Sequence, residues 1–343
     1  MKKSLFLKQS CNELPSNYQF NGIDLFKFAA AILICMIHIQ PFSTEAFSIA
    51  RYLNFGLQQY FCRLAVPFYF AASGFLLFRK TDFNCLDGNT FQLYCFRILR
   101  LLGTWTVLLF VGKKSQLWYL GALVVAVVLL YLLLRSRLSL GWIAVITFVL
   151  YLIGLLGDSY YGFLRPLKGI PPAQLVISWY EALFTSTRNG FFFGPVFVFM
   201  GALFAQKKII LDNWKMLLGL LLSLAAMLAE VFLLKQYSHP RDYNMSFSLL
   251  PATFFIFYAA SHLDLSNRPI YGRLRIIGML IFYLHLFFDY FSGVVIETVK
   301  NNLGADLSAY QFLMTLVVTV GFSIAIERLS KKSRFAWLRF LYS

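Results

Sequence analysis

Charged residues are scarce in this chain. Asp, Glu, Lys and Arg make up 13% of its 343 residues, whereas hydrophobic residues make up 59% and the mean hydropathy is +0.67. Soluble domains carry about 25% charged residues, and no stretch here is long and polar enough to form one. The composition predicts an all-α polytopic membrane protein, a helical bundle of about ten transmembrane helices.

Several enzyme motifs are also missing. The sequence contains no HExxH, P-loop, GxGxxG or GxSxG motif, and its five cysteines form no CxxC pair. Metal-dependent and nucleotide-hydrolysing chemistry therefore has no sequence basis, and no metal site is expected. The first 22 residues lack the apolar region of a cleavable signal peptide.

Charge is distributed unevenly along the chain, and the net charge is +16. With the N-terminus in the cytoplasm, 21 of the 31 Lys and Arg residues fall on the cytoplasmic side. The positive-inside rule explains this excess without a nucleic-acid partner and predicts that both termini are cytoplasmic. We expect a cytoplasmic segment at 1–22, a transmembrane domain at 23–330 and a basic cytoplasmic tail at 331–343. The predicted spans are 23–40, 57–78, 96–112, 116–134, 140–157, 190–206, 214–234, 246–262, 276–296 and 309–327.

The first span carries a basic residue and a histidine eleven positions apart, Lys27 and His38. At about 100° per residue, eleven steps return to nearly the same helix face, about 16 Å further along the axis. Ionisable groups in a bilayer usually face the bundle interior and mark function, and a histidine is suited to take and return a proton. Asp24 lies three residues before Lys27 and is placed to pair with it. The alternatives are a structural hydrogen bond for His38 and an interfacial anchor for the charged pair.

Three further groups are candidates for function. Arg97 and Arg100, at the mouth of the third span, form a fork suited to phosphate, or they anchor the helix. Arg63 lies inside the outer end of the second span, where it either snorkels outward or meets an anionic group. Pro67 is expected to kink this helix, and Ser73 beside Gly74 permits close approach of a neighbour or a ligand, with packing alone an equal explanation.

A late span holds His285 and Asp289 at i and i+4, a spacing that lets a carboxylate orient an imidazole. A structural hydrogen-bonded pair is the alternative. Glu230 is a weaker candidate. The aromatic residues of the outer loop 158–189 suit a structured cap, a sugar-stacking surface or an interfacial belt.

In order, these motifs resemble the acyltransferase-3 family of integral membrane acyltransferases. The resemblance rests on Lys27 with His38, on RLAVPFYFAASGF from Arg63 to Phe75, on the RxxR pair at Arg97 and Arg100, and on FYLH ending at His285. Within the family the chain is similar to the membrane half of the membrane-bound serine racemases of vancomycin-resistance clusters. The supporting stretches are 117–123, 151–159 and 187–193, which contain Trp118 and Arg188. The soluble racemase half has no counterpart in these residues, so racemase activity is not expected from them. The family usually has a longer stretch between the RxxR and LWYL helices than is found here.

The resemblance implies an enzyme that moves an acyl group, expected to be acetyl, from cytoplasmic acyl-CoA to a hydroxyl or amine at the outer face. The acceptor is expected to be an envelope glycan or a small molecule, and the location a bacterial cytoplasmic membrane. The expected catalytic residues are His38, His285 and Asp289. Arg97, Arg100, Lys27 and Asp24 are expected to bind acyl-CoA, and Arg63, Ser73, Trp118 and Arg188 the acceptor. The alternatives are an amino-acid permease without transferase activity and a non-catalytic membrane subunit.

Overall fold

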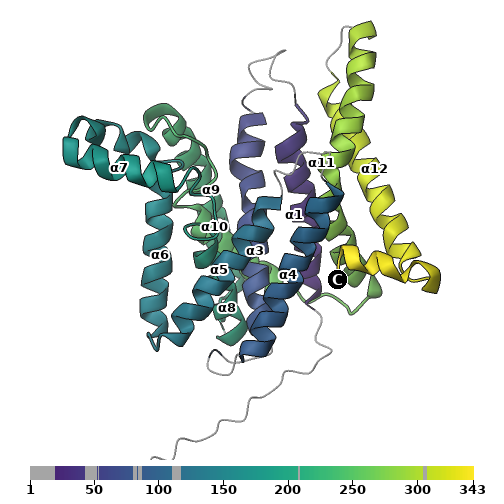
Figure 1. Ribbon diagram of the computed structural model, residues 1–343, viewed down its shortest axis with the longest axis horizontal. Coiled ribbons are helices and arrows are strands. Elements are labelled where there is room, and N and C mark those ends of the chain that lie inside the picture. Colours follow the sequence, from purple (N-terminus) through teal and green to yellow (C-terminus); the bar gives the residue numbers. More distant parts are fainter. Residues whose placement is uncertain are drawn as a thin grey trace, which may run out of the picture.

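The computed structural model describes residues 20–42, 52, 54–79, 83, 87–109, 117–207, 209–303 and 307–343, with only the backbone described at 300–303. The regular secondary structure of these ranges is entirely helical, which confirms the predicted all-α class. Figure 1 shows most of the helices running side by side, with α7 lying across one end. The helices are α1 (Asn21–Ile39), α3 (Ala65–Phe78), α4 (Gly88–Leu108), α5 (Trp118–Arg135), α6 (Leu140–Leu156), α7 (Pro171–Leu183), α8 (Gly194–Gln206), α9 (Asn213–Tyr237), α10 (Leu249–His262), α11 (Pro269–Leu303) and α12 (Ser308–Leu329).

Six helical segments are long and apolar enough to cross a membrane, and a seventh span is formed if α6 is joined to the short helical turns 161–169, at a bend of 78°. Every predicted span contains a helix, but ten full spans are not found among the described residues. Helices α8 and α10 have 13 and 14 residues, about 20 Å each, which is shorter than the hydrocarbon core of about 30 Å. The orientation of the termini stays a prediction.

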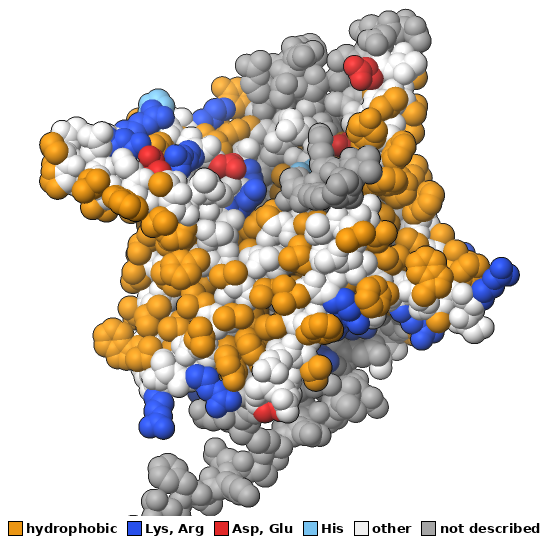
Figure 2. Space-filling view, viewed as in Figure 1, with side chains coloured by type: hydrophobic (Ala, Val, Ile, Leu, Met, Phe, Trp, Pro, Cys, Tyr) orange, Lys and Arg blue, Asp and Glu red, His pale blue; other side chains and the backbone are white. Residues whose placement is uncertain are grey.

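A broad band of hydrophobic side chains crosses the middle of the molecule in Figure 2, and Lys and Arg side chains gather at its lower border and at its upper left. Side chains exposed in this way are unfavourable in water but match the hydrocarbon of a bilayer and its charged interfaces. The surface therefore agrees with a multi-pass membrane protein.

Helices α3 and α8 pack at glycines that face the partner backbone. A Cβ on Gly74 would lie 2.8 Å from the carbonyl carbon of Val198, and one on Gly201 would lie 2.6 Å from that of Ala71. The pairing 74–198 and 71–201 shows that the two helices run antiparallel. Small residues permit this close approach in membrane bundles, so of the two explanations for Ser73-Gly74 the structure shows helix packing at Gly74.

The helix that leads into α3 is irregular. Residues 57–61 form a π-helical turn and residues 62–64 a 3₁₀ turn before the regular α3 helix begins at Ala65. Pro67 has no N–H to donate to the carbonyl four residues earlier, that of Arg63, and its ring crowds that carbonyl. The predicted distortion at Pro67 therefore falls one turn earlier, at Arg63 itself.

The connection after α6 is a folded cap at the end of the bundle. It consists of 3₁₀ turns at 161–164 and 166–169 followed by α7. The Tyr161 hydroxyl donates to Glu181 over 2.6 Å, and Lys168 forms an ion pair with the same carboxylate at 3.0 Å. Glu230 of α9 accepts hydrogen bonds from the N–H groups of Phe247 and Ser248 over 2.6 and 2.8 Å. Glu230 therefore satisfies donors at the start of α10.

Candidate functional site

A cavity of about 70 Å³ lies where α1, the turn before α3, α5, α11 and two loops meet. Four predicted residues from separate parts of the chain line it: His38, Arg63, Trp118 and Arg188. The other lining residues are Ile34, Ile37, Val66, Tyr119, Phe193, Asn244 and Phe282. The structure thus brings together an imidazole, two guanidinium groups and an apolar wall, as is common in small-molecule sites.

A second histidine stands directly behind His38. The ring centroids of His38 and His285 are 5.3 Å apart, and His285 is fully buried. Nδ1 of His285 lies 3.0 Å from the carbonyl oxygen of Ile281. Because a carbonyl only accepts, this nitrogen carries the proton, which leaves Nε2 as an acceptor with no hydrogen-bond partner among the described residues.

The predicted pairing of Asp289 with His285 is wrong. Asp289 accepts a hydrogen bond of 2.9 Å from the Gln311 side chain on α12, while the backbone of the preceding turn holds the imidazole. Gln311 on the neighbouring helix satisfies Asp289, and the Ile281 carbonyl within α11 satisfies Nδ1 of His285. The i, i+4 spacing therefore does not decide which groups pair.

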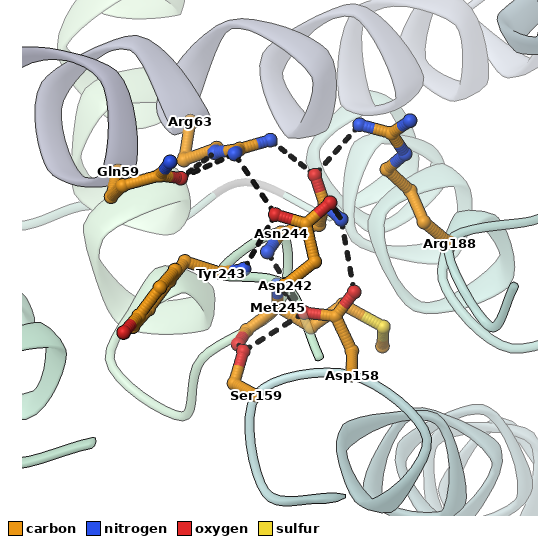
Figure 3. Close-up of polar contacts among 9 residues, drawn as sticks. All are labelled: Gln59, Arg63, Asp158, Ser159, Arg188, Asp242, Tyr243, Asn244 and Met245. Atoms are coloured by element: carbon orange, nitrogen blue, oxygen red, sulfur yellow. Dashed lines mark hydrogen bonds and ion pairs between the residues drawn. The ribbon is translucent and has the colours of Figure 1, made fainter. Parts of the chain in front are cut away.

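Arg63 and Arg188 meet at one amide, the side chain of Asn244, as Figure 3 shows. Asn244 Oδ1 accepts from Nη1 of Arg63 and, over 2.7 Å, from Nη1 of Arg188. Its Nδ2 donates to Asp158 over 3.0 Å and to Asp242 over 2.6 Å. The loop between α9 and α10 therefore sets the spacing of two arginines from other parts of the chain.

Asp158, at the end of α6, supports this loop from below. Its Oδ1 accepts from the backbone N–H of Asn244 (2.8 Å) and of Met245 (3.1 Å) and from the hydroxyl of Ser159 (2.9 Å). Burial raises the pKa of the Asp158 carboxyl, while its hydrogen bonds act in the opposite direction. Both oxygens of the carboxyl accept hydrogen bonds from protein groups, so Asp158 has a structural role in the site.

Ser73 does not line the cavity. Its hydroxyl lies 3.2 Å from that of Tyr119, and its carbonyl accepts from Tyr94 over 3.4 Å. Tyr119 does line the cavity, so Ser73 contacts the site through it. Trp118 lies under Arg188, whose guanidinium carbon is 4.7 Å from the indole ring centroid, a cation–π contact.

The predicted donor residues lie toward the opposite end of α1. Asp24 forms an ion pair of 3.6 Å with Arg275 of α11 instead of pairing with Lys27, because α11 packs against α1 there. The charges that act on Lys27 are those of Asp24, Arg275, Arg97 and Arg79. This end of the bundle is therefore strongly basic.

Arg97 and Arg100 differ in their surroundings. Arg97 is exposed, whereas Arg100 donates to the backbone carbonyl of Ser343 and lies 4.7 Å from the Phe340 ring centroid. The 3₁₀ helix Ser333–Leu341 reaches α4 there, and its Leu341 carbonyl accepts from the Trp105 indole over 3.0 Å. The two arginines lie near the middle of α4, which begins at Gly88, and not at the start of a helix as predicted; Arg100 has protein partners in this structure.

Sequence reasoning missed Asn244 and Asp242, because their polar loop gives no sign that it reaches a cavity. No three His, Cys, Asp or Glu side chains of the described ranges cluster as they would in a metal site.

Comparison with known proteins gives one family. A sequence profile described as an acyltransferase domain matches residues 20–328. The chain belongs to the acyltransferase-3 family. The match includes the cavity and the basic end of the bundle, so both lie within the family domain.

Curated relatives carry a different name. The chain is 29% identical to a serine/alanine racemase of Enterococcus gallinarum over an alignment of 359 positions, which covers 93% of the chain. It is 31% identical to an amino-acid racemase of Enterococcus faecalis over an alignment of 209 positions, which covers 55% of the chain. These matches cover 47% and 28% of the two relatives, so the chain spans half of their length or less. No solved structure matches the chain significantly.

Proposed function

We propose that this membrane acyltransferase moves an acyl group, acetyl in the simplest case, from acyl-CoA to a hydroxyl or amine of an acceptor. The donor binds at the basic end of the bundle and the acceptor enters the cavity, so that the two meet at His38. The observation that carries the proposal is the cavity itself, where His38 stands beside a buried second histidine. The family supplies the reaction class.

The chemistry follows from the roles of the residues. His38 removes the proton from the acceptor hydroxyl as its oxygen attacks the thioester carbonyl. The bond from that carbon to sulfur breaks, and the thiol of coenzyme A leaves with the proton that His38 returns. His285 stands behind His38 and offers Nε2, which has no hydrogen-bond partner among the described residues, as an acceptor. A general base of this kind contributes about 10²- to 10⁴-fold in rate.

The donor site is proposed at Arg97, Arg100 and Lys27, with Asp24 balancing the charge. Guanidinium groups bind phosphate through paired charge-assisted hydrogen bonds. Arg97 is exposed and available, whereas Arg100 exchanges its contact with the Ser343 carbonyl for phosphate when the donor binds. The proposed setting is the cytoplasmic membrane of a bacterium, with an envelope glycan or a small molecule as acceptor.

The test uses inverted membrane vesicles that contain the protein and are supplied with radiolabelled acetyl-CoA. We expect label in an acceptor fraction with the wild type, and a loss of about two to four orders of magnitude with His38→Gln. Glutamine keeps the hydrogen bonds of histidine but does not shuttle a proton.

The matched control is His262→Gln. His262 stacks on Tyr258 with ring centroids 4.1 Å apart, away from the cavity. Near wild-type transfer in His38→Gln would reject His38 as the base and leave His285 as the candidate.

A second candidate function is transport of a small amino acid, because the relative from Enterococcus gallinarum is named for serine and alanine. Proteoliposomes without acyl-CoA separate the two functions. Uptake of labelled L-serine that His38→Gln leaves unchanged supports a permease, whereas acyl transfer without solute flux supports the enzyme.

A further inference from the structure

The two arginines of the cavity have different roles. We infer that Arg188 binds a carboxylate carried by the acceptor, whereas Arg63, four of whose five N–H donors are given to protein groups, is a positioning residue. The inference rests on the proposed function only in calling the ligand an acceptor, because a permease substrate would meet the same two groups.

Arg63 is almost fully engaged by the protein. Its Nε donates to Gln59 over 3.0 Å, its Nη2 donates to Gln59 and to Asp242, the latter over 3.2 Å, and its Nη1 donates to Asn244. Its side chain is 10% exposed, and the Asp242 carboxylate compensates its charge. A guanidinium held on all three nitrogens shapes the wall and cannot turn toward a new anion without losing these bonds.

Arg188 is held but not used up. One of its Nη1 protons is donated to Asn244 over 2.7 Å, and its planar face stacks on Trp118. Among the described residues, no carboxylate lies within 4.0 Å of it, in contrast to Arg63. It is half-buried at the cavity, so its charge is only partly screened by water. An oxyanion there would gain a charge-assisted hydrogen bond in a site of reduced dielectric.

Asn244 fixes the geometry. Its oxygen accepts from both arginines, and its two amide protons go to Asp158 and Asp242. An amide has two donor protons and two acceptor lone pairs, so this side chain has nothing left for a ligand. Asn244 therefore holds Arg188 in a preset orientation, as Figure 3 shows.

The remaining wall defines the ligand. Apart from His38, the groups facing the cavity around Arg188 are aromatic or aliphatic, or belong to Arg63, Asn244 and Tyr119. A cavity of about 70 Å³ holds several water molecules, because one water needs about 10–15 Å³ of such space. A small end group fits, with its carboxylate at Arg188 and its hydroxyl or amine at His38. A hydroxy acid, an amino acid and a uronic acid share that chemistry.

The experiment measures binding without acyl-CoA, so its result is independent of transfer. Saturation-transfer NMR on the purified full chain compares D-glucuronate with D-glucose, and glycolate with ethylene glycol. We expect signal from the carboxylate member of each pair, and at least a tenfold weaker affinity for it in Arg188→Gln. Arg165→Gln, an exposed arginine outside the cavity, is the matched control and should bind as wild type does.

Four outcomes would overturn the inference: equal binding of the neutral analogues, unchanged carboxylate affinity in Arg188→Gln, no binding of any probe, or binding of D-glucose 6-phosphate in place of glucuronate. Arg188→Lys covers the case in which the glutamine variant does not fold. It keeps the charge but not the fork, and should weaken glucuronate binding by less than the glutamine variant. If neither variant folds, the wild-type comparison of charged and neutral probes decides. If Arg188→Gln loses carboxylate binding but keeps acyl transfer, the carboxylate is not that of the acceptor, and this inference alone is contradicted. Transfer by His38→Gln tests the proposed function.

Discussion

The contact between α3 and α8 predicts a graded loss of stability when methyl groups are added to it. A Cβ at Gly74 would overlap the Val198 carbonyl group, 2.8 Å from its carbon. The obstacle is helix backbone and not the end of a flexible side chain, so the helices must move apart. Overpacking of this kind costs about 1–3 kcal/mol, and we expect Gly74→Ala to fall at about 3 kcal/mol. At about 2 °C per kcal/mol, the Tm should fall by about 6 °C.

The assay is thermal unfolding of the purified protein in detergent, followed by circular dichroism. Gly121→Ala on α5 is the control, because a Cβ there meets no atom within 4 Å, and it should leave the Tm within about 1 °C or raise it. Gly201→Ala should resemble Gly74→Ala. The double variant should cost less than the sum, because one separation of the helices relieves both overlaps. A Tm of Gly74→Ala equal to that of the control would refute the close packing.

Three further predictions concern the two ends of the bundle. Arg97→Ala and Arg100→Ala should each weaken acetyl-CoA binding by about 1–3 kcal/mol through loss of charge-assisted bonds, and an unchanged affinity in the double variant, measured by equilibrium binding, would contradict the donor site. Glu230→Gln should lower the free energy of unfolding by about 1–2 kcal/mol, because Phe247 and Ser248 donate to different carboxylate oxygens and glutamine keeps only one acceptor oxygen. A chemical denaturation midpoint equal to wild type would argue against this. The Tyr161 hydrogen bond, followed by Lys168, holds the pKa of Glu181 below its usual 4.5, so its stabilisation of the cap is present at neutral pH and is lost as the pH falls through that lowered pKa. The protection factors of amides in the cap, which correct exchange rates for their intrinsic pH dependence, should then fall in acid in the wild type, and the same fall in Glu181→Gln would exclude Glu181 as its cause.

The fold class could be predicted because membrane helices need long apolar runs, and each such run contains a helix in the structure. The number of complete spans could not. Helix α10 ends at His262 after 14 residues, although hydropathy extends its predicted range to 17. Short helices such as α8 and α10 are stable here because they pack against longer neighbours, with Phe197 and Phe257 fully buried. Tertiary packing of this kind is not encoded in local periodicity.

The site was predicted in part. The residues with a local sequence signal were found, and the residue that joins them across a long sequence separation was not. His38, Arg63, Trp118 and Arg188 carry motif or resemblance signals, and all four line the cavity. Asn244, which joins the two arginines, is 181 residues from one and 56 from the other, and no local pattern encodes such contacts.

Local spacing also misassigned two partners. Asp24 and Asp289 each have a candidate partner three or four residues away, yet they contact Arg275 and Gln311 on a neighbouring helix. Pairs at these spacings contribute only about 0.2–0.5 kcal/mol, so a donor supplied by tertiary packing readily replaces them.

The position of Arg63 connects a backbone irregularity to the chemistry of the cavity. Pro67 leaves the carbonyl of Arg63 without its helical donor, and the chain there forms π and 3₁₀ turns. In a regular α-helix each residue advances by 100°, so these turns change the direction in which residue 63 projects. They allow its guanidinium to reach Asn244 and Asp242. The Asp242 carboxylate and the amides of Gln59 and Asn244 hold Arg63 on all three nitrogens, so Arg63 fixes a stable wall. Arg188, which has no such compensation, is left as the cation that a ligand can meet.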